Sequence, residues 1–233
     1  MKKKNTPTVA AVILAAGCGS RMNASKTKQT MELLGHSVIW HTVKAFFECE
    51  SVDSIVLVGR EEELGFLKSE LAVFSEKISA IVKGGDTRRE SAEIGFLTVG
   101  EEYDFVAIHD GARCLVTKEG IDAVIAKACE CGCATAASAV TDTIKAVGSD
   151  GRIISTLDRS ALMRATTPQI FRRDIYAEAL SLAQNSSVTD DNMLVEAYGA
   201  PVYCVDIGDE NIKITTMSDY YFAEIILEKR MKK

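Results

Sequence analysis

The stretch Val9-Ala-Ala-Val-Ile-Leu14, followed directly by Ala15-Ala16-Gly17-Cys18-Gly19, says most about the fold. A short continuous apolar run is typical of a strand that is buried on both faces, as in a parallel sheet. The two glycines after it indicate a loop whose backbone can approach a ligand closely. The segment therefore predicts a buried parallel strand that leads into a binding loop.

Strand-like and helix-like segments alternate along the rest of the chain. Strands are expected at residues 54–58, 78–82, 105–108, 134–140 and 202–206. Helices are expected at residues 37–49, 61–71, 88–97, 117–131, 172–183 and 190–198, and from Ser218 onward. This alternation predicts an α/β fold with a Rossmann-like, mostly parallel twisted sheet and helices on both faces.

A different pattern begins near Thr143. Residues 143–147 and 152–156 flank Ser149-Asp150-Gly151, which is a good signal for a β-hairpin. The hairpin is expected to project from the main sheet as an arm at about residues 141–160. Because no linker, repeat or low-complexity stretch divides the sequence, residues 1–233 are expected to form a single domain.

The charge balance argues against some classes of partner. The 233 residues include 27 basic and 33 acidic side chains, a formal net charge of −6 at pH 7. Proteins that coat nucleic acid are usually basic, so no nucleic-acid partner is expected. The longest apolar run, from Val9 to Ala16, is shorter than the roughly 18 residues of a membrane span, so no membrane partner is expected either.

Cysteine usage favours a reducing compartment. The seven cysteines form no paired framework, which is typical of a cytoplasmic protein with reduced thiols. An alternative is a short lipoprotein signal, in which Lys2 to Lys4 precede the apolar run and Cys18 is the lipidated residue. The spacing of Cys129, Cys131 and Cys133 matches neither a zinc site nor a redox pair, so we assign them to a helix end and the next strand.

Three segments with unusual chemistry follow strands, and ligands of open α/β sheets bind beyond the carboxyl ends of the strands. In the first, residues 14–22, Gly17 and Gly19 let backbone N–H groups approach a ligand. Arg21 and the nearby Lys28 add positive charge, and the combination indicates a nucleoside triphosphate. The pattern is neither a P-loop nor a dinucleotide fingerprint. A tight turn with solvated surface charges is the alternative for this segment taken alone.

The second segment, residues 84–91, reads Gly-Gly-Asp-Thr-Arg-Arg-Glu-Ser. Paired glycines after a strand, with a hydroxyl at a helix start, can bind a base or a ribose through backbone and side-chain hydrogen bonds. A glycine turn followed by helix-capping polar residues explains the same pattern. The residues alone leave both interpretations open.

The third segment, residues 109–113, reads His-Asp-Gly-Ala-Arg. The carboxylate of Asp110 directly follows an apolar strand and is placed to hold a divalent cation, which prefers hard oxygen ligands. Arg113 is suited to binding a phosphate. His109 is expected to be a packed histidine rather than a catalytic one.

Taken together, these segments resemble the 2-C-methyl-D-erythritol 4-phosphate cytidylyltransferase family of the non-mevalonate isoprenoid pathway. The resemblance runs from about Val9 to Glu224, and the motifs occur in the family's order. They are Leu-Ala-Ala-Gly-x-Gly-x-Arg-Met at 14–22, Lys-Gln at 28–29, Gly-Gly-x-x-Arg-x-x-Ser at 84–91, His-Asp-x-Ala-Arg at 109–113, Asp-Thr-x-Lys at 142–145, Thr-Pro-Gln-x-Phe at 167–171, Thr-Asp-Asp at 189–191 and Asn-Ile-Lys-Ile-Thr at 211–215.

The resemblance implies CTP as co-substrate and Mg²⁺ as the divalent cation. The positions that it assigns to binding them are Ala15, Ala16, Gly17, Gly19, Lys28, Gly85, Asp86, Ser91, Asp110 and Ala112. Within this set, Asp110 matches the family's magnesium carboxylate. Arg21 and Lys28 match the residues taken to stabilise the transition state.

The resemblance also implies how the acceptor, 2-C-methyl-D-erythritol 4-phosphate, is held. Arg159 and Lys213 match the pair that positions it. The assisting positions are Arg113, Thr143, Thr167 and Thr189. The family forms homodimers through the arm, and the sequence leaves open whether Arg159 and Thr143 serve their own site or that of the partner subunit.

The implied reaction is attack by the acceptor phosphate on the α-phosphorus of CTP, with release of pyrophosphate. The nearest alternative is a related cytidylyltransferase that acts on ribitol 5-phosphate, and a more distant one is a catalytically inactive nucleotide-binding protein. The chain departs from the family at Gly111, where alanine is usual, and at Cys114, where proline is usual. Both changes are expected to loosen the loop after Asp110.

Overall fold

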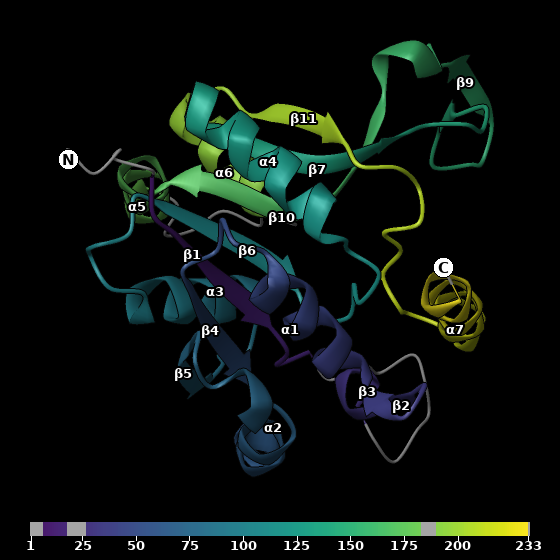
Figure 1. Cartoon of the computed structure of the whole chain (residues 1–233). Helices are drawn as coiled ribbons and strands as arrows, with labels where there is room; N and C mark the ends of the chain where they lie inside the picture. Colours follow the sequence, from purple (N-terminus) through teal and green to yellow (C-terminus); the bar gives the residue numbers. More distant parts are fainter. Residues whose placement is uncertain (1–6, 18–26, 183–189, 233) are drawn as a thin grey trace.

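The computed structural model describes residues 7–17, 27–182 and 190–232. The strands of its main sheet are β1 (Val9–Leu14), β4 (Ser54–Gly59), β5 (Ile78–Lys83), β6 (Phe105–Asp110), β7 (Cys133–Ala139), β10 (Met163–Arg172) and β11 (Tyr203–Asp206). Their order in the seven-stranded sheet is β11-β7-β10-β6-β1-β4-β5 (Figure 1). Neighbouring strands are parallel except where β10 pairs with β6 and β7. The mostly parallel α/β sheet expected from the sequence is confirmed.

β1 lies inside the sheet because its residues are apolar and mostly small or β-branched, and all of them are buried. Its parallel neighbours β4 and β6 pair with it on both sides. Alternate side chains enter two different cores, since successive side chains of a strand point to opposite faces. Ala11 and Ile13 pack into one core, and Val12 and Leu14 into the other.

Helices cover both faces of the sheet, as expected from the sequence. The core that contains Ile13 also takes apolar side chains from α1 (Val38–Glu48), α2 (Leu64–Glu70) and α4 (Lys118–Cys131). The core that contains Val12 takes side chains from α3 (Arg88–Thr98), α5 (Arg173–Leu182) and α6 (Asp191–Tyr198). Gly132 ends α4 with a φ of 91°, a left-handed conformation that glycine adopts without strain.

A third apolar cluster, formed by Leu33, Val38, Cys114, Leu115, Ile214 and Ala223, joins the C-terminal helix α7 (Met217–Met231) to the rest of the chain. Its residue Leu33 belongs to the short hairpin made by β2 (Glu32–Leu33) and β3 (His36–Ser37). Single-turn helices lie before β2, between β4 and α2, and between α2 and β5; they are η1 (Lys28–Thr30), η2 (Glu61–Glu63) and η3 (Ala72–Phe74). In the part of the chain that the structure describes, no helix is both long and apolar enough to cross a membrane.

β10 is a strand of the main sheet that was not predicted from the sequence, as the short β2 and β3 were not. It runs antiparallel between β6 and β7, and its register with β7 shifts between Ala165 and Gln169. Pro168 lies within this shift; proline has no N–H for the ladder and is unusual in a central strand. The strand forms because residues 167–171 are buried, with Ile170 in one core and Phe171 in the other.

The chain between β7 and β10 forms the hairpin arm that the sequence predicted. β8 (Lys145–Val147) and β9 (Ile153–Thr156) pair antiparallel, and Gly151 turns the chain between them with a φ of 80°. The arm extends away from the sheet (Figure 1). Ile153 and Ile154 are 60% and 67% exposed on it. The arm returns to β10 through the single turn η4 (Arg159–Ala161).

The contact between α3 and the sheet generates a stability prediction. A Cβ on Gly95 would lie 2.2 Å from Cγ1 of Val12 and 2.9 Å from Cγ2 of Val58, so the contact has no room for a methyl group. Alanine normally stabilises a helix interior by about 1 kcal/mol relative to glycine. We nevertheless expect Gly95→Ala to lower the free energy of unfolding by about 1–3 kcal/mol, because it overpacks this contact. Urea denaturation measures the difference.

Gly65 in α2 provides the matched control, because nothing lies within 4 Å of a Cβ placed there. Gly65→Ala is expected to raise the free energy of unfolding by up to about 1 kcal/mol. The two substitutions should therefore have opposite signs. A stabilising effect of Gly95→Ala would contradict the close approach of α3 to β1 and β4.

Candidate active site

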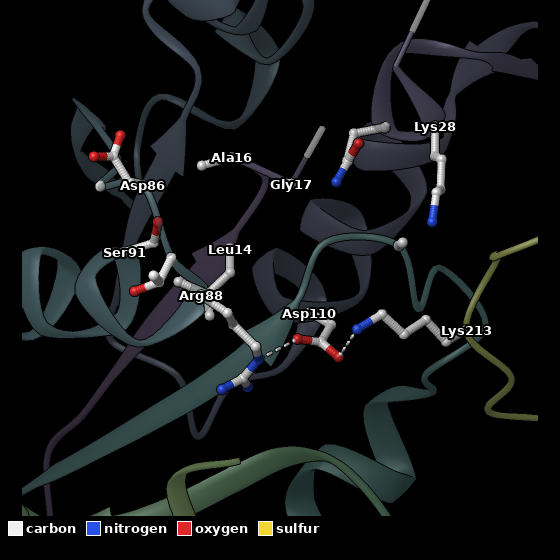
Figure 2. A pocket seen from close by; sticks show the side chains of 13 residues that line it. Leu14, Ala16, Gly17, Lys28, Asp86, Arg88, Ser91, Asp110 and Lys213 are labelled. Atoms are coloured by element: carbon white, nitrogen blue, oxygen red, sulfur yellow. Dashed lines mark hydrogen bonds and ion pairs between the residues drawn. The ribbon is translucent and has the colours of Figure 1, made fainter. Parts of the chain in front are cut away.

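A cavity of about 340 Å³ lies where β1 and β6 end. The carboxyl ends of parallel strands meet at one edge of a sheet, so the segments after β1, β5 and β6 converge there. The residues that line the cavity are Leu14, Ala16, Gly17, Lys28, Gln29, Gly85, Asp86, Thr87, Arg88, Ser91, Asp110, Ala112 and Lys213. The structure thus brings together the three segments that the sequence analysis selected (Figure 2).

The loop after β1 contributes Ala16 and Gly17 to this lining. Ala15, which was also expected to bind the nucleotide, is buried below them, and its N–H donates to the carbonyl of Val58 at 2.7 Å. This bond holds the start of the loop against β4. Gly19 and Arg21 lie outside the described residues.

Lys28 enters the same cavity from η1, where its side chain is buried (Figure 2). Its place in the lining puts a positive charge where a phosphate ligand can bind. Gln29 beside it is only 5% exposed, and its Oε1 has no hydrogen-bond partner within the described chain. No role was predicted for Gln29, because only the folded structure shows that this amide oxygen is buried without a partner among the described residues.

The packing of the segment after β5 requires a glycine. A Cβ on Gly84 would lie 2.6 Å from Cβ of Ala16 and 2.7 Å from Oγ of Ser91. Only glycine therefore allows this turn to pack against the loop after β1. Gly85, Asp86 and Ser91, to which the resemblance assigns nucleotide binding, line the cavity.

The helix-capping interpretation of this segment is confirmed. Oγ1 of Thr87 accepts the N–H of Glu90 at 3.1 Å. Oε2 of Glu90 accepts the N–H groups of Asp86 at 2.7 Å and Thr87 at 3.1 Å. These bonds form a capping box at the start of α3. The same residues thus begin a helix and form one wall of the cavity.

Asp110 is the centre of the charge arrangement in the cavity. Its side chain is 11% exposed; Oδ1 accepts from Nε of Arg88 at 3.1 Å, and Oδ2 from Nζ of Lys213 at 2.8 Å (Figure 2). Nε of Arg113 lies 3.7 Å from Oδ2. Burial acts to raise the pKa of Asp110, but the charges of Arg88, Lys213 and Arg113 hold it well below its ordinary value. Asp110 is therefore an ionised carboxylate surrounded by cations.

Arg88 and Asp191 lie within two of the motifs quoted above, but their pairing was not predicted from the sequence. Nη1 of Arg88 donates to Oδ2 of Asp191 at 2.7 Å, across a separation of 103 positions. Burial acts to lower the pKa of Arg88, but Asp191 and Asp110 raise it above its ordinary value. Arg88 therefore stays charged between two carboxylates. No local sequence pattern connects residues that are so far apart along the chain.

The loop after β6 is held tightly, although Gly111 and Cys114 were expected to loosen it. The N–H of Gly111 donates to the carbonyl of Leu14 at 2.8 Å, and its carbonyl accepts from Oγ1 of Thr42 at 2.9 Å. A Cβ on Gly111 would lie only 2.9 Å from the carbonyl oxygen of Leu14, so glycine fits this loop better than alanine. Cys114 is buried in the third apolar cluster.

The same loop holds the segment that carries Lys213. The N–H of Ile214 donates to the carbonyl of Ala112 at 2.9 Å, and Nη1 of Arg113 donates to the carbonyl of Asn211 at 2.8 Å. Burial lowers the pKa of Arg113. Arg113 is thus a brace between two loops, and its contact with an acceptor phosphate stays a prediction.

His109 is a packed histidine, as the sequence analysis expected. It is fully buried, and its ring lies against Phe46 with centroids 4.8 Å apart. Its Nε2 lies 3.3 Å from the carbonyl of Arg113, which can only accept, so Nε2 carries the proton. Nδ1 then accepts from Oγ1 of Thr167 at 3.1 Å. Burial lowers the pKa of His109 to about 3.

The residues expected to hold the acceptor are only partly brought together. Thr167 is buried, and its hydroxyl oxygen accepts the N–H of Asp110 at 3.0 Å, so it supports the backbone of that residue. Thr143 and Arg159 are exposed on the arm and are absent from the cavity lining formed by the described residues. Thr189 lies outside the described residues.

The cavity offers few protein ligands for a metal ion. Within residues 7–17, 27–182 and 190–232, no three or more His, Cys, Asp or Glu side chains are arranged to share one. Mg²⁺ commonly binds through one or two carboxylates and takes its other ligands from substrate phosphates and water. The carboxylate of Asp110 therefore fits an ion that is shared with a phosphate ligand.

Comparison with known proteins supports the resemblance. The family profile described as 2-C-methyl-D-erythritol 4-phosphate cytidylyltransferase matches residues 9–229. The protein of that name from Alkaliphilus oremlandii is 40% identical over 231 residues, which cover 97% of this chain and 98% of the relative. The one from Pelotomaculum thermopropionicum is 39% identical over 226 residues, which cover 95% of both chains.

Solved structures show the same fold over nearly the whole chain. The 4-diphosphocytidyl-2C-methyl-D-erythritol synthase from Anaerococcus prevotii has a TM-score of 0.87 and 27% identity, and the alignment covers 96% of this chain and all of that one. The 2-C-methyl-D-erythritol 4-phosphate cytidylyltransferase from Francisella tularensis has a TM-score of 0.78 and 25% identity, with 94% and 99% covered.

The buried imidazole of His109 generates a pH prediction. Its pKa of about 3 in the folded protein lies below the value of about 6.5 for a histidine in an unfolded chain. Between these two values only the unfolded state takes up the proton, so the free energy of unfolding falls as the pH decreases through this range. This one group contributes about 1.4 kcal/mol per pH unit.

Urea denaturation at about pH 7 and about pH 5 tests the sign of this effect. The loss of stability between the two should be smaller in His109→Asn than in the wild-type protein. An equal loss in both proteins would show that His109 is not held neutral in the folded state.

Proposed function

The chain belongs to the 2-C-methyl-D-erythritol 4-phosphate cytidylyltransferase family, and we propose which step of the reaction each group of its residues serves. The protein joins CTP and 2-C-methyl-D-erythritol 4-phosphate to give 4-diphosphocytidyl-2-C-methyl-D-erythritol and pyrophosphate, in non-mevalonate isoprenoid precursor biosynthesis. The relatives do not favour ribitol 5-phosphate as the acceptor. The observation that supports the proposed roles is the group of cations around Asp110 at the end of β6.

The reaction transfers the cytidylyl group between two anions. An oxygen of the acceptor phosphate attacks the α-phosphorus of CTP, and the bond from that phosphorus to the oxygen bridging to the β-phosphate breaks. Pyrophosphate leaves with the electron pair of this bond. The activation barrier therefore arises mainly from repulsion between the two anions and from the negative charge that develops on the leaving group. Preorganised cations lower both contributions. Because the acceptor phosphate is already ionised near neutral pH, the neutral, buried His109 is not needed as a general base.

Two lysines supply these cations from different parts of the chain. Lys28 binds the triphosphate and stabilises the charge that develops on the leaving pyrophosphate, a role that Arg21 is expected to share. Lys213 binds the acceptor phosphate and orients it for attack. Both lysines line the cavity, which supports this division (Figure 2).

The loops after β1 and β5 bind the nucleotide. Ala16, Asp86 and Ser91 lie on the side of the cavity away from Lys213 (Figure 2), so the two reactants approach from different sides. Gly17 and Gly85 have no side chain between the ligand and the backbone, which allows close hydrogen bonds from the main chain. The nucleotide thereby lies along one wall of the cavity and its triphosphate faces the lysines.

Asp110 is the residue that would hold Mg²⁺. When bound, the ion supplies positive charge that offsets the negative charge of the phosphates. Arg88 and Lys213 hold the carboxylate of Asp110 in place at the end of β6. Ala112 in the following loop borders the same space.

The arm at about residues 141–160 forms the contact between the two single-domain chains of a homodimer. Two observations support this: Ile153 and Ile154 expose apolar surface on the arm, and Arg159 and Thr143 lie away from the cavity of their own chain. A partner subunit's arm would bring both polar groups to a cavity that otherwise lacks them. Arg159 then assists Lys213 in positioning the acceptor phosphate.

The proposed partners are two small substrates and a second copy of the chain, with no nucleic acid and no membrane. The proposed location is the cytoplasm. The cysteines at described positions have free thiols, which agrees with a reducing compartment.

A pyrophosphate-release assay tests the reaction and the role of Lys28 together. CTP with 2-C-methyl-D-erythritol 4-phosphate should release pyrophosphate much faster than CTP with ribitol 5-phosphate. Lys28→Ala should lower kcat on the order of a hundredfold, because it removes a preorganised cation from the transition state. Lys127→Ala, which removes an ion pair on the outer surface of α4, is the control and should leave kcat unchanged. Normal turnover in folded Lys28→Ala would exclude Lys28 from this role.

Mixing experiments test the origin of Arg159. Arg159→Ala and Lys28→Ala are each expected to be nearly inactive alone. After subunit exchange, mixed dimers should regain activity, because one of the two sites then combines an intact Lys28 with an intact Arg159. A mixture of Lys28→Ala and Lys213→Ala is the control and should not recover, since both lysines lie in the same chain's cavity. Without recovery in the first mixture, Arg159 would serve the site of its own chain.

A further inference from the structure

A buried carboxylate that the proposed reaction does not use lies next to the cavity. Asp191, the first residue of α6, is 1% exposed. Its Oδ1 accepts from the hydroxyl of Tyr176 at 2.7 Å, and its N–H donates to Oε1 of Gln169 at 3.1 Å. A buried charge of this kind is costly unless it is paired. Its partner is Arg88, whose Nη1 donates to Oδ2 at 2.7 Å.

Tyr176 is itself held rigidly. The residue is fully buried, and its ring stacks on that of Phe171, with centroids 5.1 Å apart and an angle of 10° between the planes. The ring of Phe96 packs against it edge-on at 5.0 Å. The hydroxyl of Tyr176 therefore has a fixed position, and it fixes the carboxylate of Asp191.

Arg88 connects the fixed carboxylate of Asp191 to Asp110 in the cavity. While Nη1 is held by Asp191, Nε of the same guanidinium donates to Oδ1 of Asp110 at 3.1 Å. Because a guanidinium is planar and presents its donors in a fixed fork, holding one nitrogen restricts the direction of the other. The orientation of the Asp110 carboxylate is thus connected to the interior of the protein.

Lys213 holds the other oxygen of Asp110 in a different way. Its Nζ donates to Oδ2 at 2.8 Å, but its side chain is 38% exposed and is a flexible chain of methylene groups. Lys213 is thus held to Asp110 by one contact of a flexible, partly exposed side chain. Arg88 is held more firmly, because its guanidinium also pairs with the buried carboxylate of Asp191.

We propose that Arg88 is a positioning residue, which keeps the Asp110 carboxylate oriented when Lys213 moves from Asp110 to the acceptor phosphate. Asp191 and Tyr176 act through Arg88 by preventing its side chain from following the incoming phosphates. The departure of Lys213 releases Oδ2 while Arg88 retains Oδ1. This inference rests on the proposed roles of Asp110 and Lys213.

The test compares Arg88→Lys, Asp191→Asn and the double variant. A lysine cannot reach both carboxylates with a fixed fork, and an asparagine keeps the shape of Asp191 without its charge. Each single variant should lower kcat by about tenfold. The affinity of the CTP-bound enzyme for Mn²⁺, followed by electron paramagnetic resonance, should fall by about tenfold in Arg88→Lys.

The double variant distinguishes positioning from two separate effects. If Asp191 acts through Arg88, the double variant should be no slower than Arg88→Lys alone. Multiplicative losses in kcat would overturn the proposal, as would an unchanged kcat in Arg88→Lys. If Asp191→Asn fails to fold, Tyr176→Phe replaces it, because it removes a single hydroxyl from the same carboxylate. Its smaller loss should likewise disappear in the Arg88→Lys background.

A matched control is available at another arginine–aspartate pair. Nε of Arg172 lies 2.6 Å from Oδ1 of Asp174, and both side chains are exposed at the end of β10 and the start of α5. Arg172→Lys and Asp174→Asn should leave kcat and Mn²⁺ affinity unchanged. Losses in kcat at this pair as large as those at Arg88 would show that the assay reports general stability, and this result would overturn the proposal.

Asp110→Asn separates this inference from the proposed function. If Asp110→Asn retains kcat, the proposed role of Asp110 has failed, and the inference fails with it. If Asp110→Asn is inactive while Arg88 and Asp191 behave independently, the proposed function stands and only the positioning role is overturned.

Discussion

The parallel pairing of β1 with β6 places Leu14 opposite Asp110 at the ends of the two strands, and the site depends on this register. The pairing continues beyond the strands, where the N–H of Gly111 donates to the carbonyl of Leu14. Since both strands are buried on both faces, a shift by one residue would reverse every side chain between the two cores. The nucleotide loop after β1 and the carboxylate after β6 are therefore held at a fixed distance by the core itself.

The charges around Asp110 show how a protein with a net charge of −6 builds a site for two anions. The cations Arg88, Lys213 and Arg113 gather at one carboxylate, and this keeps it ionised despite its burial. The same carboxylate holds these cations together at the end of β6. The acidic excess belongs to the rest of the surface, so the net charge of the chain says little about the charge of its cavity.

The insertion of β10 between β6 and β7 has two consequences for the site. Thr167 within β10 supports the backbone of Asp110 and the ring of His109, so the strand adjoins the cavity. The arm is inserted between β7 and β10, whose pairing from Met163 with Ala139 onward holds its base. A projecting hairpin on a rigid base is well suited to reach a second subunit, as proposed for Arg159.

Local patterns in the sequence were enough to predict the alternation of strands and helices, the turn of the arm at Gly151, and the glycine-rich and acidic segments that meet at the cavity. Those features depend on periodicity, strand burial and turn chemistry, which act over a few neighbouring residues. The family resemblance added Lys28 and Lys213 to the predicted site residues, and both line the cavity. β10 was missed because Pro168 and the register shift conceal its pairing. The ion pair between Arg88 and Asp191 was missed because the two residues are 103 positions apart, although each lies within a motif quoted above. Only the tertiary structure decided which cation holds which oxygen of Asp110, because that choice depends on distances between distant segments and on the burial of their charges.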